Sequence, residues 1–96
     1  MPTDLPPLSG EVEEYLDHLT VERGLSPNTL SAYRRDLAKY QLFLAERGLW
    51  NLSDLPAGVV GDFLVSLRRP GAERQLAQSS ISRTIVSVRR FHAFAV

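Results

Sequence analysis

Hydrophobic residues recur every three or four positions in four separate stretches of this chain, which are joined by turn-forming residues. This spacing is typical of amphipathic α-helices, and no stretch shows the strict alternation of a half-buried β-strand. The four stretches cover residues 10–23, 27–47, 56–68 and 79–96. The pattern therefore predicts an all-α bundle of four helices with short connections, preceded by a lead-in over residues 1–9.

Local signals mark several of the predicted helix ends. Gly24 and Gly48 follow the first and second helices, where a left-handed residue commonly ends a helix. Ser26 and Pro27 fit the N-cap and the first helical residue of the second helix, because a proline there loses no hydrogen bond. Gly58 lowers the helix propensity at the start of the third stretch, so that helix has no well-defined first residue.

Each predicted helix has one apolar stripe, and the four stripes together supply the predicted core. The stripe of the second helix spans about 80° of the helical wheel. The predicted core residues are Val12, Tyr15, Leu16, Leu19, Leu30, Tyr33, Leu37, Tyr40, Leu44, Val59, Val60, Phe63, Leu64, Leu67, Ile81, Ile85, Val88 and His92. Trp50 and Leu52, in the connection after the second helix, are expected to close one end of the bundle.

Composition narrows the class of protein without adding a site. The chain has 96 residues, 44% of them hydrophobic and 23% charged, which suits one small globular domain. It has no cysteine, which excludes disulfides, and His18 has no partner at metal-ligand spacing. No apolar run approaches the ~20 residues of a membrane span. We therefore expect no metal, cofactor, small-molecule substrate or membrane partner, and a cytoplasmic location.

Charge is divided unevenly along the chain, although its formal net value is +0. Residues 1–22 include six acidic residues and no basic one, whereas residues 23–96 contain all 11 basic residues. The near-neutral total therefore conceals an acidic first helix and a basic remainder. Ordinary solvated helix faces give the same asymmetry, so charge alone does not identify a partner.

Two of the predicted helices have cations on the face opposite their apolar stripe. The two rows are Ser31, Arg35 and Lys39 on the second helix, and Arg83, Ser87 and Arg90 on the fourth. Short hydroxyl side chains beside arginine and lysine suit contacts with phosphates and base edges. The rows indicate a nucleic-acid surface, with solvated surface arginines as the alternative.

Three segments in order, "GLSPNTLSAYRRDL", "SDLPAGVVGDFLVSLRR" and "RTIVSVRRFHAF", resemble one protein family. Their order and spacing are similar to those of the N-terminal core-binding, SAM-like domain of tyrosine recombinases and phage integrases, and most similar to the bacterial Xer type. The resemblance covers residues 10–96. It implies an orthogonal four-helix bundle whose second and fourth helices cross the major groove of double-stranded DNA.

The resemblance also implies which side chains meet the DNA. They are Thr29, Ser31, Arg34, Arg35 and Lys39 from the second helix, and Ser79, Ser80, Arg83, Ser87 and Arg90 from the fourth. Arg83 is the expected base reader, since arginine can fork onto guanine. Arg34 and Arg89 lie closer to the apolar stripes, and pairing with Asp36 or Asp62 is the alternative for them. The acidic first helix is expected to face away from the phosphates.

The chemistry of the family is expected to lie outside this chain. The resemblance implies a tyrosine nucleophile, assisted by arginine, lysine and histidine and without a metal, in a C-terminal domain. This sequence has no H-x-x-R segment, and its last tyrosine, Tyr40, falls in the core stripe. We expect the DNA-binding part of a longer recombinase, with no catalytic residue of its own. Its expected partners are that catalytic domain and other protomers, in chromosome dimer resolution at the bacterial nucleoid.

Two other functions remain open. The acidic first helix and an exposed Phe94 would suit a helical protein-interaction module. A helix-turn-helix repressor fits less well, because the connection after Gly48 is long for the turn before a recognition helix. Salt-dependent binding to duplex DNA separates the DNA-binding functions from the interaction module.

Overall fold

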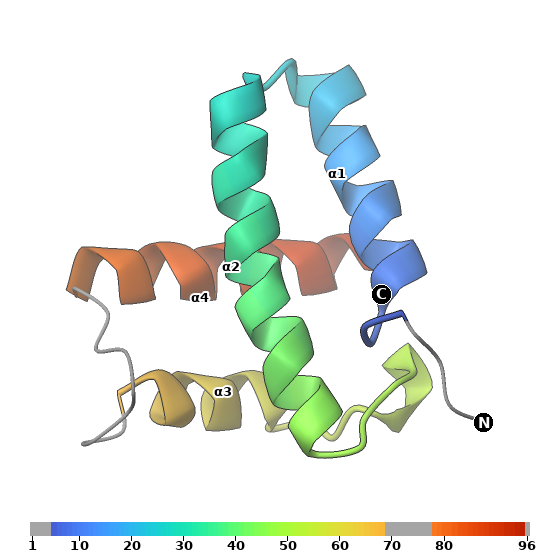
Figure 1. Cartoon of the computed structure of the whole chain (residues 1–96), viewed down its shortest axis with the longest axis vertical. Helices are drawn as coiled ribbons and strands as arrows, with labels where there is room; N and C mark the ends of the chain where they lie inside the picture. Colours follow the sequence, from blue (N-terminus) through green and yellow to red (C-terminus); the bar gives the residue numbers. More distant parts are fainter. Residues whose placement is uncertain (1–4, 69–77, 96) are drawn as a thin grey trace.

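Four α-helices and one short 3₁₀ helix make up the part of the chain that the computed structural model describes, residues 5–68 and 78–95. They are α1 (Ser9–Arg23), α2 (Pro27–Glu46), η1 (Leu52–Asp54), α3 (Val59–Leu67) and α4 (Gln78–Ala95). α1 and α2 are antiparallel neighbours, α4 crosses both of them, and α3 lies alongside α4 (Figure 1). The predicted all-α fold of four helices is confirmed.

The core lies where α2 meets the other helices. Leu37 and Leu44 of α2 and Val88 and Phe91 of α4 are 0% exposed. The ring of Phe91 meets the edge of Tyr15 from α1, with 5.7 Å between the ring centroids. These contacts remove large apolar surfaces from water, which is the main term that stabilises a small bundle.

The predicted stripes are confirmed for α1 and largely for α2. Ile81, Ile85 and Val88 of the predicted α4 stripe are buried as well, but the buried face of α4 is wider than predicted. The buried face of α4 includes Thr84 and Phe91, both 0% exposed, whereas His92 is only half-buried. The predicted stripe of Ile81, Ile85, Val88 and His92 omits Thr84 and Phe91, which lie to one side of it on the helical wheel. Ser87 lies on the same buried face of α4 and is also 0% exposed.

The N-terminal lead-in helps to close the end of the bundle that Trp50 and Leu52 were predicted to close. The prediction is wrong for Trp50, which is 40% exposed, whereas Leu52 is partly buried against the core as expected. Leu8 is 3% exposed. Leu8 has a left-handed φ of 58°, which is unfavourable for a residue with a side chain. The buried amide of Gln41 donates to the Pro7 carbonyl at 2.9 Å and helps to hold this turn against α2.

The helix ends follow the predicted signals with one exception. Gly24 and Gly48 have φ values of 57° and 70°, as expected for residues that end helices. Ser26 caps α2 through its side chain. α3 begins at Val59 instead of near Pro56, because residues 57–58 form a turn. Most of the loop predicted between the third and fourth helices lies outside the described residues.

A tyrosine–histidine pair links α2 to α4 and predicts how stability depends on pH. The Tyr40 hydroxyl and His92 Nε2 are 2.5 Å apart. Burial lowers the pKa of His92 from 6.5 and raises the pKa of Tyr40 to about 12. The unfolded chain therefore takes up the histidine proton more readily than the folded chain does, and stability should fall as the pH decreases below 6.5.

We expect the urea midpoint of unfolding to fall between about pH 7.5 and pH 5.5, a window dominated by histidine titration. His92→Phe should remove most of this dependence, because it removes the buried titrating group. Circular dichroism over the pH series measures the effect. A parallel loss of stability in both proteins would contradict the assignment to His92.

Candidate nucleic-acid interface

The first turn of α2 presents hydroxyl groups at a helix N-terminus. Ser26 Oγ accepts the backbone N–H of Thr29 at 3.2 Å, and the two hydroxyl oxygens of these residues are 3.0 Å apart. Thr29 and Ser31 are both exposed. The helix N-terminus favours a negatively charged ligand, and Thr29, the third residue of α2, lies within the first turn, where a phosphate would be attracted.

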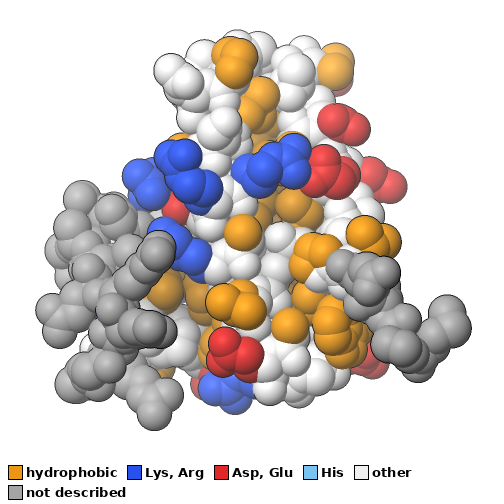
Figure 2. Space-filling model, in the orientation of Figure 1, with side chains coloured by type: hydrophobic (Ala, Val, Ile, Leu, Met, Phe, Trp, Pro, Cys, Tyr) orange, Lys and Arg blue, Asp and Glu red, His pale blue; other side chains and the backbone are white. Residues whose placement is uncertain are grey.

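Lys and Arg side chains gather over the upper half of α2, with acidic side chains beside them toward α1 (Figure 2). Arg35 is exposed and makes no ion pair with another residue of the described ranges. Lys39 is half-buried, and its Nζ is 3.9 Å from an oxygen of Asp36. Arg35 is thus the α2 cation that is most available to an external anion.

Arg34 is neutralised by the acidic first helix. Its two terminal nitrogens donate to the carboxylate of Glu13 at 2.6 and 3.2 Å. The hydrogen bonds raise the pKa of Arg34 and lower the pKa of Glu13. Pairing with an acid was the alternative expected for Arg34, but the acid is Glu13 of α1. One acidic side chain of α1 therefore lies against a cation of α2.

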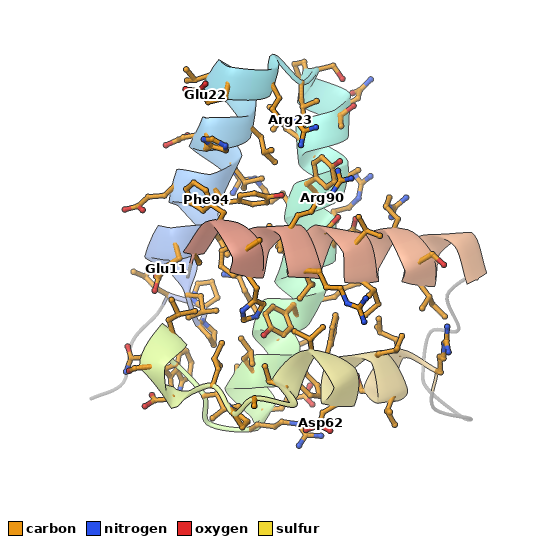
Figure 3. The ribbon with its side chains drawn as sticks, turned by 180° about the vertical axis from the view of Figure 1, so that it is seen from behind. Glu11, Glu22, Arg23, Asp62, Arg90 and Phe94 are labelled. Atoms are coloured by element: carbon orange, nitrogen blue, oxygen red, sulfur yellow. The ribbon has the colours of Figure 1, made fainter. Side chains whose placement is uncertain are left out.

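The predicted row on α4 is divided between the surface and the core. Arg90 is exposed and makes no ion pair with another described residue, and it lies on the side of α4 that faces the viewer in Figure 3. Ser87 is 0% exposed, and its hydroxyl donates to Asp36 at 3.3 Å. The placement of Ser87 on the outer row is wrong, because the buried face of α4 extends further round the helix than its apolar residues indicate. Ser79 and Ser80 belong to α4, but their side chains lie outside the described residues.

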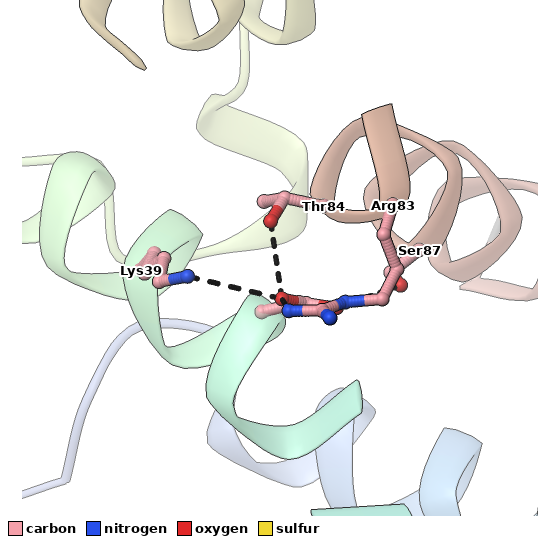
Figure 4. A network of polar contacts seen from close by, with 5 residues as sticks. Lys39, Arg83, Thr84 and Ser87 are labelled. Carbon is pink, nitrogen blue, oxygen red and sulfur yellow. Dashed lines mark hydrogen bonds and ion pairs between the residues drawn. The ribbon is translucent and has the colours of Figure 1, made fainter. Parts of the chain in front are cut away.

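A buried carboxylate joins the two helices that carry the cations. Asp36 of α2 is 0% exposed. Arg83 of α4 donates to both of its oxygens, from Nε at 2.9 Å and from Nη2 at 3.1 Å. The Thr84 hydroxyl donates to it at 3.0 Å, and these side chains converge with Lys39 and Ser87 around it (Figure 4). The hydrogen bonds with Asp36 raise the pKa of Arg83.

Both oxygens of the Asp36 carboxylate accept hydrogen bonds from surrounding side chains. Two guanidinium nitrogens and two hydroxyl groups donate to it, and one ammonium group lies nearby. Within the ranges that the structure describes, no buried side-chain nitrogen or oxygen lacks a hydrogen-bond partner. A satisfied network of this kind fixes the crossing of α2 and α4, because any shift would leave a buried charge without its donors.

Asp36 is the important residue of this surface that the sequence pattern does not assign to a site. It appears there only as one possible partner for other arginines. A signal does exist, since Asp36 directly precedes Leu37 at the edge of an apolar stripe. A matching set of arginine, threonine and serine occurs on α4 at positions 83, 84 and 87, within one helical turn.

The sequence of the chain matches one domain family. Residues 12–96 match the family described as "Phage integrase, N-terminal SAM-like domain", and the chain belongs to that family. Among curated proteins, it is 44% identical over 91 residues to tyrosine recombinase XerD of Mycobacterium tuberculosis, covering 92% of this chain and 29% of that protein. It is 41% identical over 85 residues to XerD of Staphylococcus haemolyticus, covering 88% of this chain and 28% of that protein.

These matches confirm the resemblance to the N-terminal domain of Xer-type tyrosine recombinases. The chain spans less than a third of the length of the curated relatives named above. No solved structure matches it significantly. None of the helices in the described ranges is long and apolar enough to cross a membrane.

Proposed function

We propose that this chain is the DNA-binding N-terminal domain of a Xer-type tyrosine recombinase and holds duplex DNA through α2 and α4. One observation carries the proposal: Arg83 of α4 is bound to Asp36 of α2, so the cations of two crossing helices belong to one rigid surface. Arg35 adds an unpaired cation to this surface. Cations on two crossing elements suit the paired phosphate strands of a duplex.

The residues predicted to contact DNA differ in how accessible their side chains are. The accessible contacts are Thr29, Ser31, Arg35, Lys39 and Arg83. Arg90 is also exposed, but it is seen from the side opposite to the cations of α2 (Figures 2 and 3), so it is proposed only as a contact outside this surface. Arg34 joins them where a phosphate displaces Glu13, since that ion pair is more than half exposed on both sides. Ser79 and Ser80 are retained on the family resemblance alone. Ser87 is excluded as a direct contact because it is buried.

The activity of the whole protein is part of the same proposal. The named relatives are tyrosine recombinases, and the chain matches less than a third of each. We propose that a C-terminal domain supplies the nucleophile and that other protomers bind the same DNA. The process is DNA recombination, with resolution of chromosome dimers in the cytoplasm, at the bacterial nucleoid, as its specific form.

Salt dependence tests the proposed function. We expect the binding constant for a fluorescent duplex to fall with salt, with a slope of about −0.9 for each phosphate contact. Arg35→Ala should weaken binding to all sequences alike and reduce the size of the slope by about one. Fluorescence anisotropy at several salt concentrations measures both quantities.

Arg47→Ala is the matched control, because Arg47 is an exposed arginine just after the opposite end of α2. Its guanidinium lies over the Phe43 ring at 4.4 Å, so its thermal unfolding is recorded as well. The control should keep the wild-type slope. A wild-type slope near zero, or equal effects of the two variants, would contradict the proposed surface.

A second candidate function is protein docking through α1 and the end of α4. Phe94 is 38% exposed and meets Tyr15 and His18 with ring centroids 5.4 and 5.0 Å apart. Phe94 and His18 are exposed above the buried Tyr15, and Phe94 lies beside α1, which carries Glu11 and Glu22 (Figure 3). A docking module without a DNA partner would show no salt-dependent duplex binding, so the same titration separates the two functions.

A further inference from the structure

We infer that Asp36 is a positioning residue that holds the guanidinium of Arg83 ready for a sequence-specific contact with DNA. The inference rests on the proposed DNA-binding function and goes beyond it by assigning the origin of specificity. Asp36 is 0% exposed and cannot touch DNA. It acts through Arg83, whose side chain is 47% exposed.

The hydrogen bonds determine which edge of the guanidinium is available. Arg83 has five N–H donors, and Asp36 takes one from Nε and one from Nη2. The two hydrogens of Nη1 and the second hydrogen of Nη2 remain. One hydrogen of Nη1 and the remaining hydrogen of Nη2 form the end-on edge of the guanidinium, with two parallel donors that match O6 and N7 of guanine.

The carboxylate is itself held in place, which makes the orientation of Arg83 specific. Thr84 and Ser87 donate to opposite oxygens of Asp36, and both are 0% exposed. The plane of the carboxylate therefore fixes the plane of the guanidinium. An arginine that is ordered before DNA binds loses less rotamer freedom on binding.

Charge alone and positioning predict effects on different quantities when this carboxylate is removed, namely overall affinity and discrimination between sequences. Asp36 is a negative charge near the DNA surface, so by charge alone its removal should strengthen binding to every sequence. If Asp36 positions Arg83, its removal should weaken discrimination between sequences. A role confined to folding would change stability and leave discrimination unaltered.

The experiment compares two isosteric variants, Asp36→Asn and Glu13→Gln. Each removes one negative charge and weakens the carboxylate partner of an arginine, but the Glu13–Arg34 pair is exposed. Duplexes selected by the wild-type 96-residue chain from a random pool serve as the specific probe, and the unselected pool serves as the non-specific probe. The quantity measured is the ratio of the two binding constants.

We expect Asp36→Asn to lower this ratio by about five- to a hundredfold, the range for one bidentate arginine contact, without weakening binding to the unselected pool. Glu13→Gln should strengthen both interactions and keep the ratio. In an Arg83→Ala background, Asp36→Asn should have no further effect on the ratio. An unchanged ratio in Asp36→Asn would overturn the inference and leave the proposed function intact.

If the proposed function is wrong, the wild-type protein will show no salt-dependent binding to duplex DNA. The inference about Asp36 is then overturned together with the proposed function. Circular dichroism shows whether Asp36→Asn is folded. If it is not, Arg83→Lys decides, because lysine keeps the charge but cannot form the fork. A lowered ratio in Arg83→Lys supports the inference, and a wild-type ratio overturns it.

Discussion

Replacing Phe91 with alanine should lower the free energy of unfolding by about 3–5 kcal/mol, the range for a large aromatic side chain lost from a core. Phe91 is 0% exposed and lies on the face of α4 that meets α1 and α2. Its ring has the edge of Tyr15 on one side, 5.7 Å away between centroids. Alanine would leave a cavity at the centre of the bundle, and a domain of this size has only about 5–15 kcal/mol of total stability.

Phe94→Ala provides a control with the same chemical change on the same helix. Phe94 is 38% exposed, so much less apolar surface returns to water, and we expect a loss of about 1 kcal/mol. Urea unfolding followed by circular dichroism measures both variants. Equal losses would show that the buried face of α4 is not centred on the side that includes Phe91.

The second large effect is expected for Asp36→Ala, at about 2–4 kcal/mol of unfolding free energy. The change removes the carboxylate to which the buried hydroxyls of Thr84 and Ser87 donate. Arg83 is 47% exposed and can turn to water, which keeps the loss below that of a fully buried ion pair. Asp17→Ala is the matched control, because Asp17 is an exposed aspartate within α1 and should change stability by no more than about 0.5 kcal/mol.

A double-mutant cycle tests whether Asp36 and Arg83 act as one unit. Arg83→Ala leaves a buried carboxylate whose remaining cation is Lys39 at 3.9 Å, so it should also destabilise the fold. The double variant Asp36→Ala/Arg83→Ala should lose less than the sum of the two single losses, because each change breaks the same contact. Additive losses would argue against a coupled network.

The parts of the fold that depend on local sequence were predictable. The cap at Ser26 and the left-handed residues Gly24 and Gly48 follow from single residue types at fixed positions. The stripe of α1 follows from the helical period, since Val12 and Leu19 recur on one face and both are 3% exposed. These features require no knowledge of how the helices pack.

The parts of the candidate site that depend on packing were not predictable in the same way. Ser87 is polar and was placed outside, but the crossing of α2 and α4 brings an acceptor, Asp36, to its hydroxyl. Arg34 was placed on the DNA side, but α1 brings Glu13 within reach of it. In both residues the partner is distant in sequence, and helical periodicity on one element gives no information about which side chain of another element lies opposite.

The turn at Pro7 and Leu8 determines how this domain can be shortened or fused to other proteins. A version that began at Ser9 would remove the buried side chain of Leu8 from the core and would deprive the Gln41 amide of its acceptor. Affinity tags and fusion partners are therefore best joined ahead of Leu5. The few residues before the first helix cover the hydrophobic core at this end of the domain. A domain boundary drawn at the first helical residue would remove this cover.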